Sequence, residues 1–370
     1  MTPIDELATL LRPAAGGLYV VSTGSAEQRR VQQRLYGVGT EPEVRKLWRA
    51  SLERIVTARA IVLGVPSDVG AGYLRGANLG PQLVRGALLD DPAWPAFLED
   101  SGVIDVGDVF VVPQLLHDDM LNDRQIAATR RAIYAEVSDA ERATLPVSPL
   151  SITERALDLI FSLNPQVKPF VIGGDHSCAW PVSAALSRVR RDWGIVQPDA
   201  HTDLLEERLG VRYCFATWSF HANELIGRGG RMVQVGTRAS RRDRAHWEST
   251  LGVRQFWAEE CRARPGETLE AIVEHLRGRA LTGVYFSNDI DGTDEAHANA
   301  TGTPEPGGLE PDFVVELIRR LGAEVGMLAG DVMEVAPPIQ RTPDGAARTL
   351  ALAARYTRAT IEAMLASPPR

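Results

Sequence analysis

Three clusters of acidic and histidine residues, each placed directly after a short apolar run, constrain this sequence most. Runs of four or five apolar residues bounded by Gly or Pro predict buried strands. In open α/β sheets, the carboxyl ends of the strands form one edge, where ligands bind. We therefore expect the three clusters to converge in space. The runs and the clusters that follow them are Pro169–Ile172 with Asp175 and His176, Gly194–Gln197 with Asp199, His201 and Asp203, and Gly283–Ser287 with Asp289, Asp291 and Asp294.

Further apolar runs alternate with amphipathic segments along most of the chain. This alternation predicts an α/β fold with a mainly parallel sheet covered by helices on both faces. The other expected strands are Ala60–Val65, Val103–Val106, Met232–Val235 and Gly326–Val332. The expected helices are Pro81–Leu89, Ser151–Leu163, Trp180–Arg190, Glu267–Arg279, Glu310–Leu321 and a closing helix Thr349–Leu365. The charged insertion from Val111 to Val147 predicts one or two surface helices.

The first 57 residues differ in character from the rest. Glu27–Leu35 and Glu41–Thr57 are charged and helix-prone, with Pro42 near a helix start. We expect a helical N-terminal extension over 1–57 that packs on the main body or on another subunit, followed by a catalytic domain over 58–370. A partly mobile tail is the alternative.

Composition narrows the functional class. With 40 Lys and Arg against 48 Asp and Glu, the net charge is −8. This charge disfavours nucleic-acid binding and offers no cationic membrane patch. No apolar run is long enough to span a bilayer, and the first residues lack a secretory pattern. Three scattered cysteines, Cys178, Cys214 and Cys261, do not make a disulfide framework. We therefore expect a reducing, cytoplasmic setting.

The spacing within the clusters indicates a metal centre. Side chains at positions i, i+2 and i+4 of an extended segment share a face, so Asp199, His201 and Asp203 converge, as do Asp289 and Asp291. Four carboxylates at the end of a buried sheet repel one another unless cations neutralise them. Two divalent cations balance the charge. Oxygen-rich ligation with two imidazoles and no thiolate favours Mn²⁺ over Zn²⁺, with Ni²⁺, Co²⁺ or Fe²⁺ as alternatives.

The same residues resemble the signatures of a known family. The segments 173–177, 199–203 and 287–294 look like the three signatures of the ureohydrolases, the arginase and agmatinase family. Weaker matches near Gly64–Asp68, Asp105–Asp108, Thr301–Gly308 and Asp331–Val335 extend the resemblance over most of the chain from about Ala58. The chain looks like an agmatinase-like member.

The resemblance implies a fold and a ligand set. The family fold is a three-layer α/β/α sandwich, and its members are commonly trimers or hexamers. By similarity, Asp199 and Asp289 bridge two manganese ions. The full set of implied ligands is His176, Asp199, Asp203 and Asp289 for one ion, and Asp199, His201, Asp289 and Asp291 for the other.

The resemblance also implies a reaction. A hydroxide bridging the two metals attacks the central carbon of a linear guanidino compound and releases urea and an amine. Glu334 resembles the glutamate that holds the guanidinium, and Asp203 is placed to pass a proton to the leaving nitrogen. A strand-end salt bridge is the alternative for Glu334.

The chain departs from the family pattern beside this site. Phe215 and Ala216 stand where a His-Gly pair is usual, and phenylalanine cannot transfer a proton. His221 follows, although a surface or core role suits it better. Trp218 and His297 are candidate substrate contacts, with a solvated loop position as the alternative for His297. Bulky Phe215 and Trp218 predict a pocket that fits a substrate as small as guanidine, whose second product is ammonia.

Two other functions stay open at this point. One is hydrolysis of a related C–N bond, such as a formimidoyl or acetyl amide, which the same fold supports. The other is a metal-loaded pseudoenzyme or regulatory subunit that has lost its proton relay at Phe215. Cys178, next to the metal cluster, is expected to pack as a buried thiol rather than act as a ligand.

Overall fold

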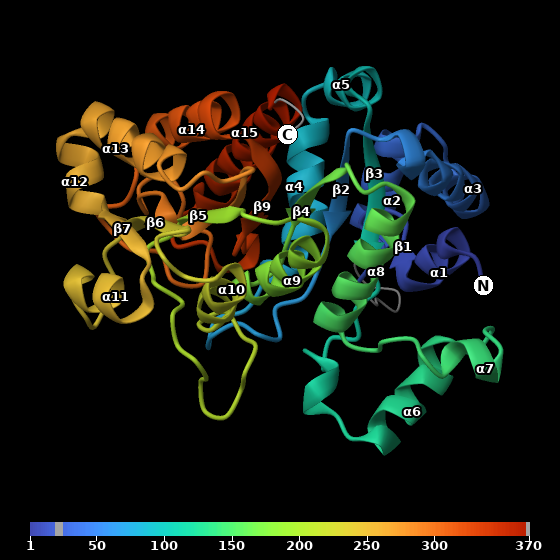
Figure 1. Cartoon of the computed structure of the whole chain (residues 1–370). Coiled ribbons are helices and arrows are strands. Elements are labelled where there is room, and N and C mark those ends of the chain that lie inside the picture. The colour runs from blue at the N-terminus through green and yellow to red at the C-terminus, as the bar shows by residue number, and fades with distance from the viewer. Residues whose placement is uncertain (19–24, 368–370) are drawn as a thin grey trace.

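A nine-stranded sheet forms the centre of the molecule in the computed structural model, which describes residues 1–18 and 25–367 (Figure 1). The strand order is β1-β3-β2-β4-β9-β8-β5-β6-β7, and all neighbours pair in parallel except β1 with β3. The strands are β1 (Leu11–Arg12), β2 (Ala60–Gly64), β3 (Val103–Val109), β4 (Lys168–Ile172), β5 (Gly194–Pro198), β6 (Met232–Thr237), β7 (Arg254–Trp257), β8 (Val284–Asp289) and β9 (Met327–Met333).

Helices cover both faces of the sheet. They are α1 (Pro3–Leu10), α2 (Ser25–Tyr36), α3 (Glu41–Glu53), α4 (Gly80–Leu89), α5 (Trp94–Ser101), α6 (Asp123–Ile133), α7 (Asp139–Arg142), α8 (Pro149–Leu163), α9 (Ala179–Val189), α10 (Trp218–Ile226), α11 (Arg244–Leu251), α12 (Ala258–Ala263), α13 (Pro265–Arg277), α14 (Pro311–Arg320) and α15 (Gly345–Ala366). The predicted α/β/α sandwich is therefore confirmed.

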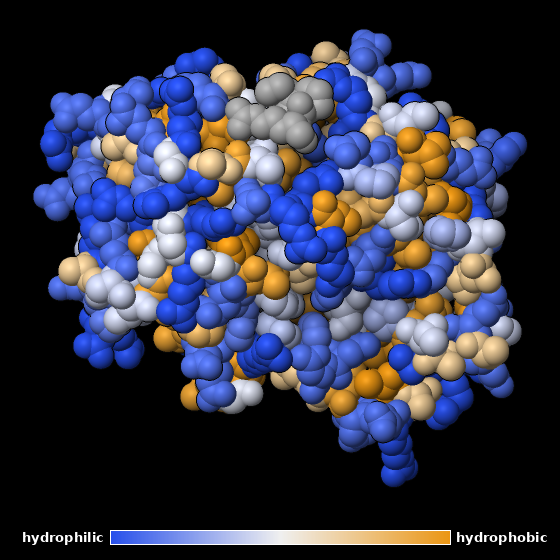
Figure 2. Space-filling view, in the orientation of Figure 1, coloured by the Kyte–Doolittle hydropathy of each residue, from blue (hydrophilic) through white to orange (hydrophobic). Residues whose placement is uncertain are grey.

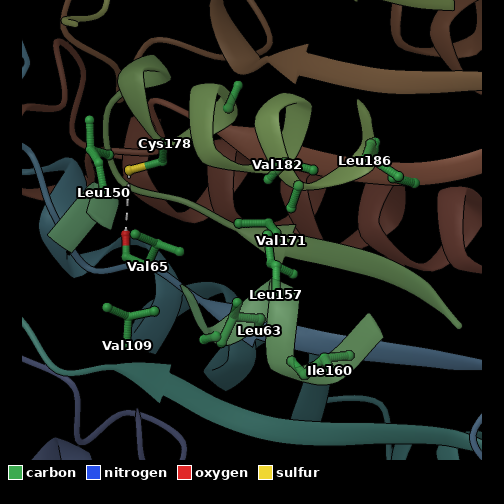
Figure 3. Close-up of a cluster of buried hydrophobic side chains, with 14 of the residues drawn as sticks. Leu63, Val65, Val109, Leu150, Leu157, Ile160, Val171, Cys178, Val182 and Leu186 are labelled. Carbon is green, nitrogen blue, oxygen red and sulfur yellow. Dashed lines mark hydrogen bonds between the residues drawn. The ribbon is translucent and has the colours of Figure 1, made fainter. Parts of the chain in front are cut away.

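Alternation along the strands divides the core into two layers. In β2, Ile61 and Leu63 pack with α1, α3, α8 and α9, whereas Ala60 and Val62 pack with α4 and α15 on the other face. Strand residues that are apolar at every position can serve both layers at once. Figure 3 shows the first layer, in which Leu63 and Val171 meet residues of α8 and α9. Cys178 is fully buried here, with its thiol 3.8 Å from Val65 O, as expected of a packing residue.

The N-terminal segment packs on the sheet. Leu7, Leu10 and Leu11 are fully buried in the first core layer, and β1 pairs with β3 to form one edge of the sheet. The indole N–H of Trp48 on α3 donates to Val106 O over 2.8 Å. The predicted helix Glu41–Thr57 ends at Glu53 and continues as a 3-10 turn, Arg54–Thr57.

Strand β3 runs three residues beyond the predicted Val103–Val106 because its acidic residues are neutralised. Arg85 of α4 is 2 % exposed and pairs with Asp105 (2.7 Å) and with Asp108. These carboxylates hold β3 to α4. They are not part of the metal clusters.

The outer surface carries both hydrophilic and hydrophobic side chains. On the face shown in Figure 2, hydrophilic side chains dominate and hydrophobic ones are scattered between them. Within the described residues, no helix combines the length and apolar character that crossing a membrane requires.

Candidate metal centre

The predicted ligands lie at the carboxyl ends of the central strands of the sheet. β4, β9, β8 and β5 are consecutive in the strand order, and their carboxyl ends lead to His176, Glu334, Asp289 and Asp199. The parallel pairing brings together residues that are more than 150 positions apart in the chain. The convergence expected from the three clusters is thus observed.

Two groups of side chains could each hold a metal ion. His176, Asp199 and Asp289 form the first group, and Asp199, His201 and Asp291 form the second, with the ligand atoms of each group within 4.8 Å of one another. Asp199 belongs to both, as a bridging ligand must. Asp289 is found only in the first group.

The sixth predicted ligand lies beside the first group. Asp203 Oδ2 is 3.4 Å from His176 Nδ1, close to the distances of 3.3 Å from this nitrogen to Asp199 Oδ2 and 3.1 Å to Asp289 Oδ2. In the second group, His201 Nδ1 is 3.1 Å from Asp291 Oδ2. All six predicted ligands therefore lie together around the two places where a metal ion could bind.

The charge of this donor set fits divalent cations. The four carboxylates are 0–7 % exposed and face only two imidazoles. Burial, reinforced by neighbouring carboxylates, raises the pKa of Asp203 and of Asp289. Burial alone would lower the pKa of His176, but the carboxylates of Asp199 and Asp289 raise it. Such a cluster without cations is short of positive charge, and metal ions supply it.

His176 is held in place by a second row of polar residues that the sequence reasoning missed. Its Nε2 lies 3.1 Å from Ser287 Oγ, and Ser287 donates to Asp331 Oδ2 over 2.8 Å. Tyr285 donates to the same oxygen. This leaves His176 Nδ1 toward the carboxylates, the arrangement in which outer partners orient a ligand. The sequence signal for Asp331 was that it is the one carboxylate within the otherwise apolar strand β9.

Asp199 is held by a row of buried glutamines across three strands. Gln197 Nε2 donates to Asp199 Oδ2 over 2.7 Å, and Gln234 Nε2 donates to Gln197 Oε1 over 2.9 Å. Gln255 Nε2 donates to Gln234 Oε1 over 2.8 Å, and the indole N–H of Trp257 donates to Gln255 Oε1 over 2.9 Å. Each of the three glutamines is fully buried. A glutamine within each of the apolar runs of β5 and β6 was the signal in the sequence.

The two candidate catalytic carboxylates both have a left-handed backbone. Asp203 has φ 53° and Glu334 has φ 62°, two of seven non-glycine residues with positive φ in the described part of the chain. Such backbone strain is retained where the surroundings impose it, often at functional sites. Glu334 Oε1 accepts a hydrogen bond from His176 N over 3.0 Å, and the residue is 9 % exposed. No cation pairs with Glu334 among the described residues, so the salt-bridge alternative finds no support.

The structure places the two other predicted substrate contacts away from an accessible pocket. Trp218 is fully buried, its ring centroid is 4.5 Å from that of His176, and its indole N–H donates to Asp203 Oδ2 over 3.1 Å. It supports the ligands and offers no free surface to a substrate. His297 is 43 % exposed and pairs with Glu310 over 3.2 Å, which matches the solvated alternative.

His221 is engaged elsewhere. Its Nε2 lies 3.0 Å from Glu206 O and 3.1 Å from Arg212 O, and its ring packs against Tyr213 and Trp180. A nitrogen occupied by loop carbonyls is not placed to serve as the missing proton relay.

Comparison with known proteins decides the family. The arginase family model matches residues 58–361, which is most of the chain. The chain belongs to the arginase family. Members of this family hydrolyse C–N bonds of amidines, and this chain is an agmatinase-like ureohydrolase by sequence.

Individual relatives support the same placement. The chain is 29% identical to a guanidinobutyrase of Pseudomonas aeruginosa over 76% of this chain and 80% of that protein. It is 30% identical to a mitochondrial agmatinase of Gallus gallus over 75% of this chain and 74% of the relative. Among solved structures, proclavaminate amidino hydrolase from Streptomyces clavuligerus superposes with a TM-score of 0.65 at 25% identity, covering 84% of this chain and 93% of that one.

Proposed function

We propose that this arginase-family chain is a binuclear manganese amidinohydrolase that cleaves a linear guanidino compound into urea and an amine. The observation that carries the proposal is the pair of ligand groups that share Asp199, with Glu334 beside them. Oxygen-rich ligation with two imidazoles favours Mn²⁺, with Ni²⁺ or Co²⁺ as alternatives. Two such cations would lower the pKa of a shared water, so that a hydroxide nucleophile is available near neutral pH.

In this proposal, Glu334 binds the guanidinium. A cationic substrate next to cations needs a compensating negative charge, and the Glu334 side chain has one oxygen left over from its bond to His176 N. Its strained backbone indicates that the surrounding structure imposes its position.

In this proposal, Asp203 carries a proton from the nucleophile to the leaving nitrogen. Its carboxylate lies within the ligand cluster and is oriented by the indole N–H of Trp218. Because Phe215 carries no proton and His221 is occupied, Asp203 is the residue placed to accept a proton from the nucleophile and pass it to the leaving nitrogen.

The test is urea release by the metal-loaded chain. Metal content is measured first, and urea is then assayed with Mn²⁺ or Ni²⁺ from agmatine, arginine, 4-guanidinobutyrate, 3-guanidinopropionate and free guanidine. We expect urea from at least one of them. Formamide or acetate from an amide substrate without urea would favour hydrolysis of a related C–N bond. Silence across both sets with two ions bound would favour a regulatory subunit.

Assembly and location are separate predictions. We expect a homo-oligomer, a trimer or hexamer, in the cytoplasm. Sedimentation and cell fractionation test these two points.

A further inference from the structure

An apolar pocket of about 480 Å³ opens beside the candidate metal centre. Three loops line it: the loop after β2, the loop after β3 and the loop between β5 and α10. Its walls include Leu115, Leu116, Leu121, Val211 and Phe215. This pocket differs from the small cleft that the sequence predicted from Phe215 and Trp218, because Phe215 lines it and Trp218 does not.

The pocket adjoins the metal-binding segment. Gly70 and Phe215 both line it, and Phe215 N donates to Gly70 O over 3.1 Å. A Cβ added at Gly70 would lie 2.5 Å from Ser177 Oγ and 2.8 Å from Asp175 Oδ1, the residues on either side of His176. The wall of the pocket therefore lies directly against the segment that carries a predicted ligand. Gly70 thus stands between the pocket and the segment that carries His176.

The rim of the pocket exposes large apolar side chains. Tyr73 is 85 % exposed, Met120 is 52 % exposed and Leu209 is 97 % exposed. Leu209 also has φ 53°, a conformation that a leucine rarely adopts. Apolar side chains gathered in this way around a hollow indicate a surface that buries an apolar group.

The charges around the pocket disfavour a cationic group. No carboxylate is among its lining residues, and its basic side chains are His117 and Arg208. His117 pairs with Asp119 outside the lining. Arg208 stacks on Phe215, with Cζ 4.8 Å from the ring centroid, and makes no ion pair with any described residue. A terminal ammonium would meet Arg208 and no lining carboxylate, because Asp119 beyond the lining already pairs with His117.

We infer that the far end of the guanidino substrate is an apolar group that packs into this pocket, and that Arg208 excludes substrates ending in an ammonium. The inference rests on the proposed function, since it concerns the tail of the compound whose guanidinium Glu334 holds.

The test compares three guanidines of matched chain length with different ends. These are N-pentylguanidine (methyl), agmatine (ammonium) and 4-guanidinobutyrate (carboxylate). We expect kcat/KM for N-pentylguanidine to exceed that for agmatine by about tenfold or more, because the two differ only at the end group: burial of a methyl is favourable, whereas burial of an unpaired ammonium is costly. Preference for agmatine would overturn the inference. Preference for 4-guanidinobutyrate that Arg208→Gln abolishes would also overturn it, because the pocket would then recognise an anion.

Variants at the rim separate a substrate pocket from other uses. Leu209→Asp should lower kcat/KM for N-pentylguanidine about tenfold and raise that for agmatine, because it adds a carboxylate to the rim. Aspartate tolerates the left-handed backbone better than leucine. Leu225→Asp, on α10 and 42 % exposed, is the matched control and should change neither. Arg208→Gln should raise agmatine turnover, and Arg212→Gln, an arginine of the same loop outside the lining, should not.

Two further outcomes are distinguishable. If Leu209→Asp changes the sedimentation of the protein and not its substrate preference, the pocket is an interface between copies of the chain and the inference is wrong. If no guanidine yields urea while two metal ions are bound, the proposed function itself fails, and this inference with it.

Discussion

The indole N–H of Trp218 donates to Asp203 Oδ2 over 3.1 Å, so a tryptophan supports a carboxylate that is both a predicted ligand and the predicted proton carrier. The ring of Trp218 also lies against His176, with centroids 4.5 Å apart. Trp218 thus contacts two residues of the metal centre: it donates a hydrogen bond to Asp203 and packs its ring against His176.

Replacing Trp218 by phenylalanine keeps the ring packing and removes the hydrogen bond. A hydrogen bond to a charged group contributes about 1.5–3 kcal/mol. We expect kcat to fall roughly ten- to hundredfold with metal content unchanged, measured by urea release and metal analysis. Trp180→Phe is the control, because Trp180 stacks on Tyr213 away from the ligands. Equal turnover in wild type and Trp218→Phe would show that Asp203 needs no such support.

Glu334→Gln removes the negative charge proposed to bind the guanidinium. Since Glu334 is in neither ligand group, we expect weaker substrate binding and turnover, with both metal ions retained. Steady-state kinetics and metal analysis of the same preparation test this. Glu310→Gln, at the exposed pair with His297, should behave as wild type. Loss of metal from Glu334→Gln would refute the assignment.

Removal of metal should destabilise the fold. Without cations, four buried carboxylates repel one another, and a ligand present at 100 times its Kd stabilises by about 2.7 kcal/mol. We expect chelation to lower Tm and Mn²⁺ to restore it.

Two aspartate variants test whether the change in Tm comes from metal bound at the two ligand groups. Asp199→Asn should lose the Mn²⁺-dependent gain in Tm, because Asp199 belongs to both ligand groups. Asp294→Asn should keep the gain, since its carboxylate accepts from Ala296 N and Gly308 N outside them. The same Tm with and without chelator in the wild type would contradict the metal centre.

Trp48→Phe tests whether the N-terminal segment is part of the folded unit. It removes the bond to Val106 O and leaves a buried acceptor without its partner, at a cost of about 2 kcal/mol. We expect this loss in the free energy of unfolding by denaturant titration, and deletion of residues 1–57 to abolish cooperative folding. Leu47→Ala, exposed on the same helix, should cost less than about 0.5 kcal/mol. A truncated chain that unfolds like the full one would show a dispensable extension.

The central strands and the metal cluster were predictable because their signals are local. Each predicted ligand follows an apolar run, and a parallel sheet brings all strand ends to one edge. β7 was missed because Arg254–Trp257 is two polar residues followed by two apolar ones, too short an apolar run to indicate a strand. The two-residue β1 has no sequence signal at all, since its pairing with β3 is set by packing of α1 and α3.

Contacts between distant residues were harder to foresee. Trp218 was predicted to contact substrate, but it is fully buried and donates to Asp203, a contact that no spacing rule encodes. Glu334 was found from a resemblance, and its left-handed backbone becomes visible only in the folded chain. The apolar pocket depends on three separate loops, whose relative placement the sequence does not reveal.

The hydrogen bonds along the row of Gln255, Gln234 and Gln197 all run in the same direction, toward Asp199. An indole N–H can donate but never accept, so Trp257 obliges the Gln255 amide to turn its oxygen outward and its nitrogen inward, and each following amide must copy that orientation. The last amide therefore presents a donor, not a lone pair, to Asp199. Trp257 on the edge strand β7 thereby determines, two strands away, that the shared metal ligand is met by an attractive dipole.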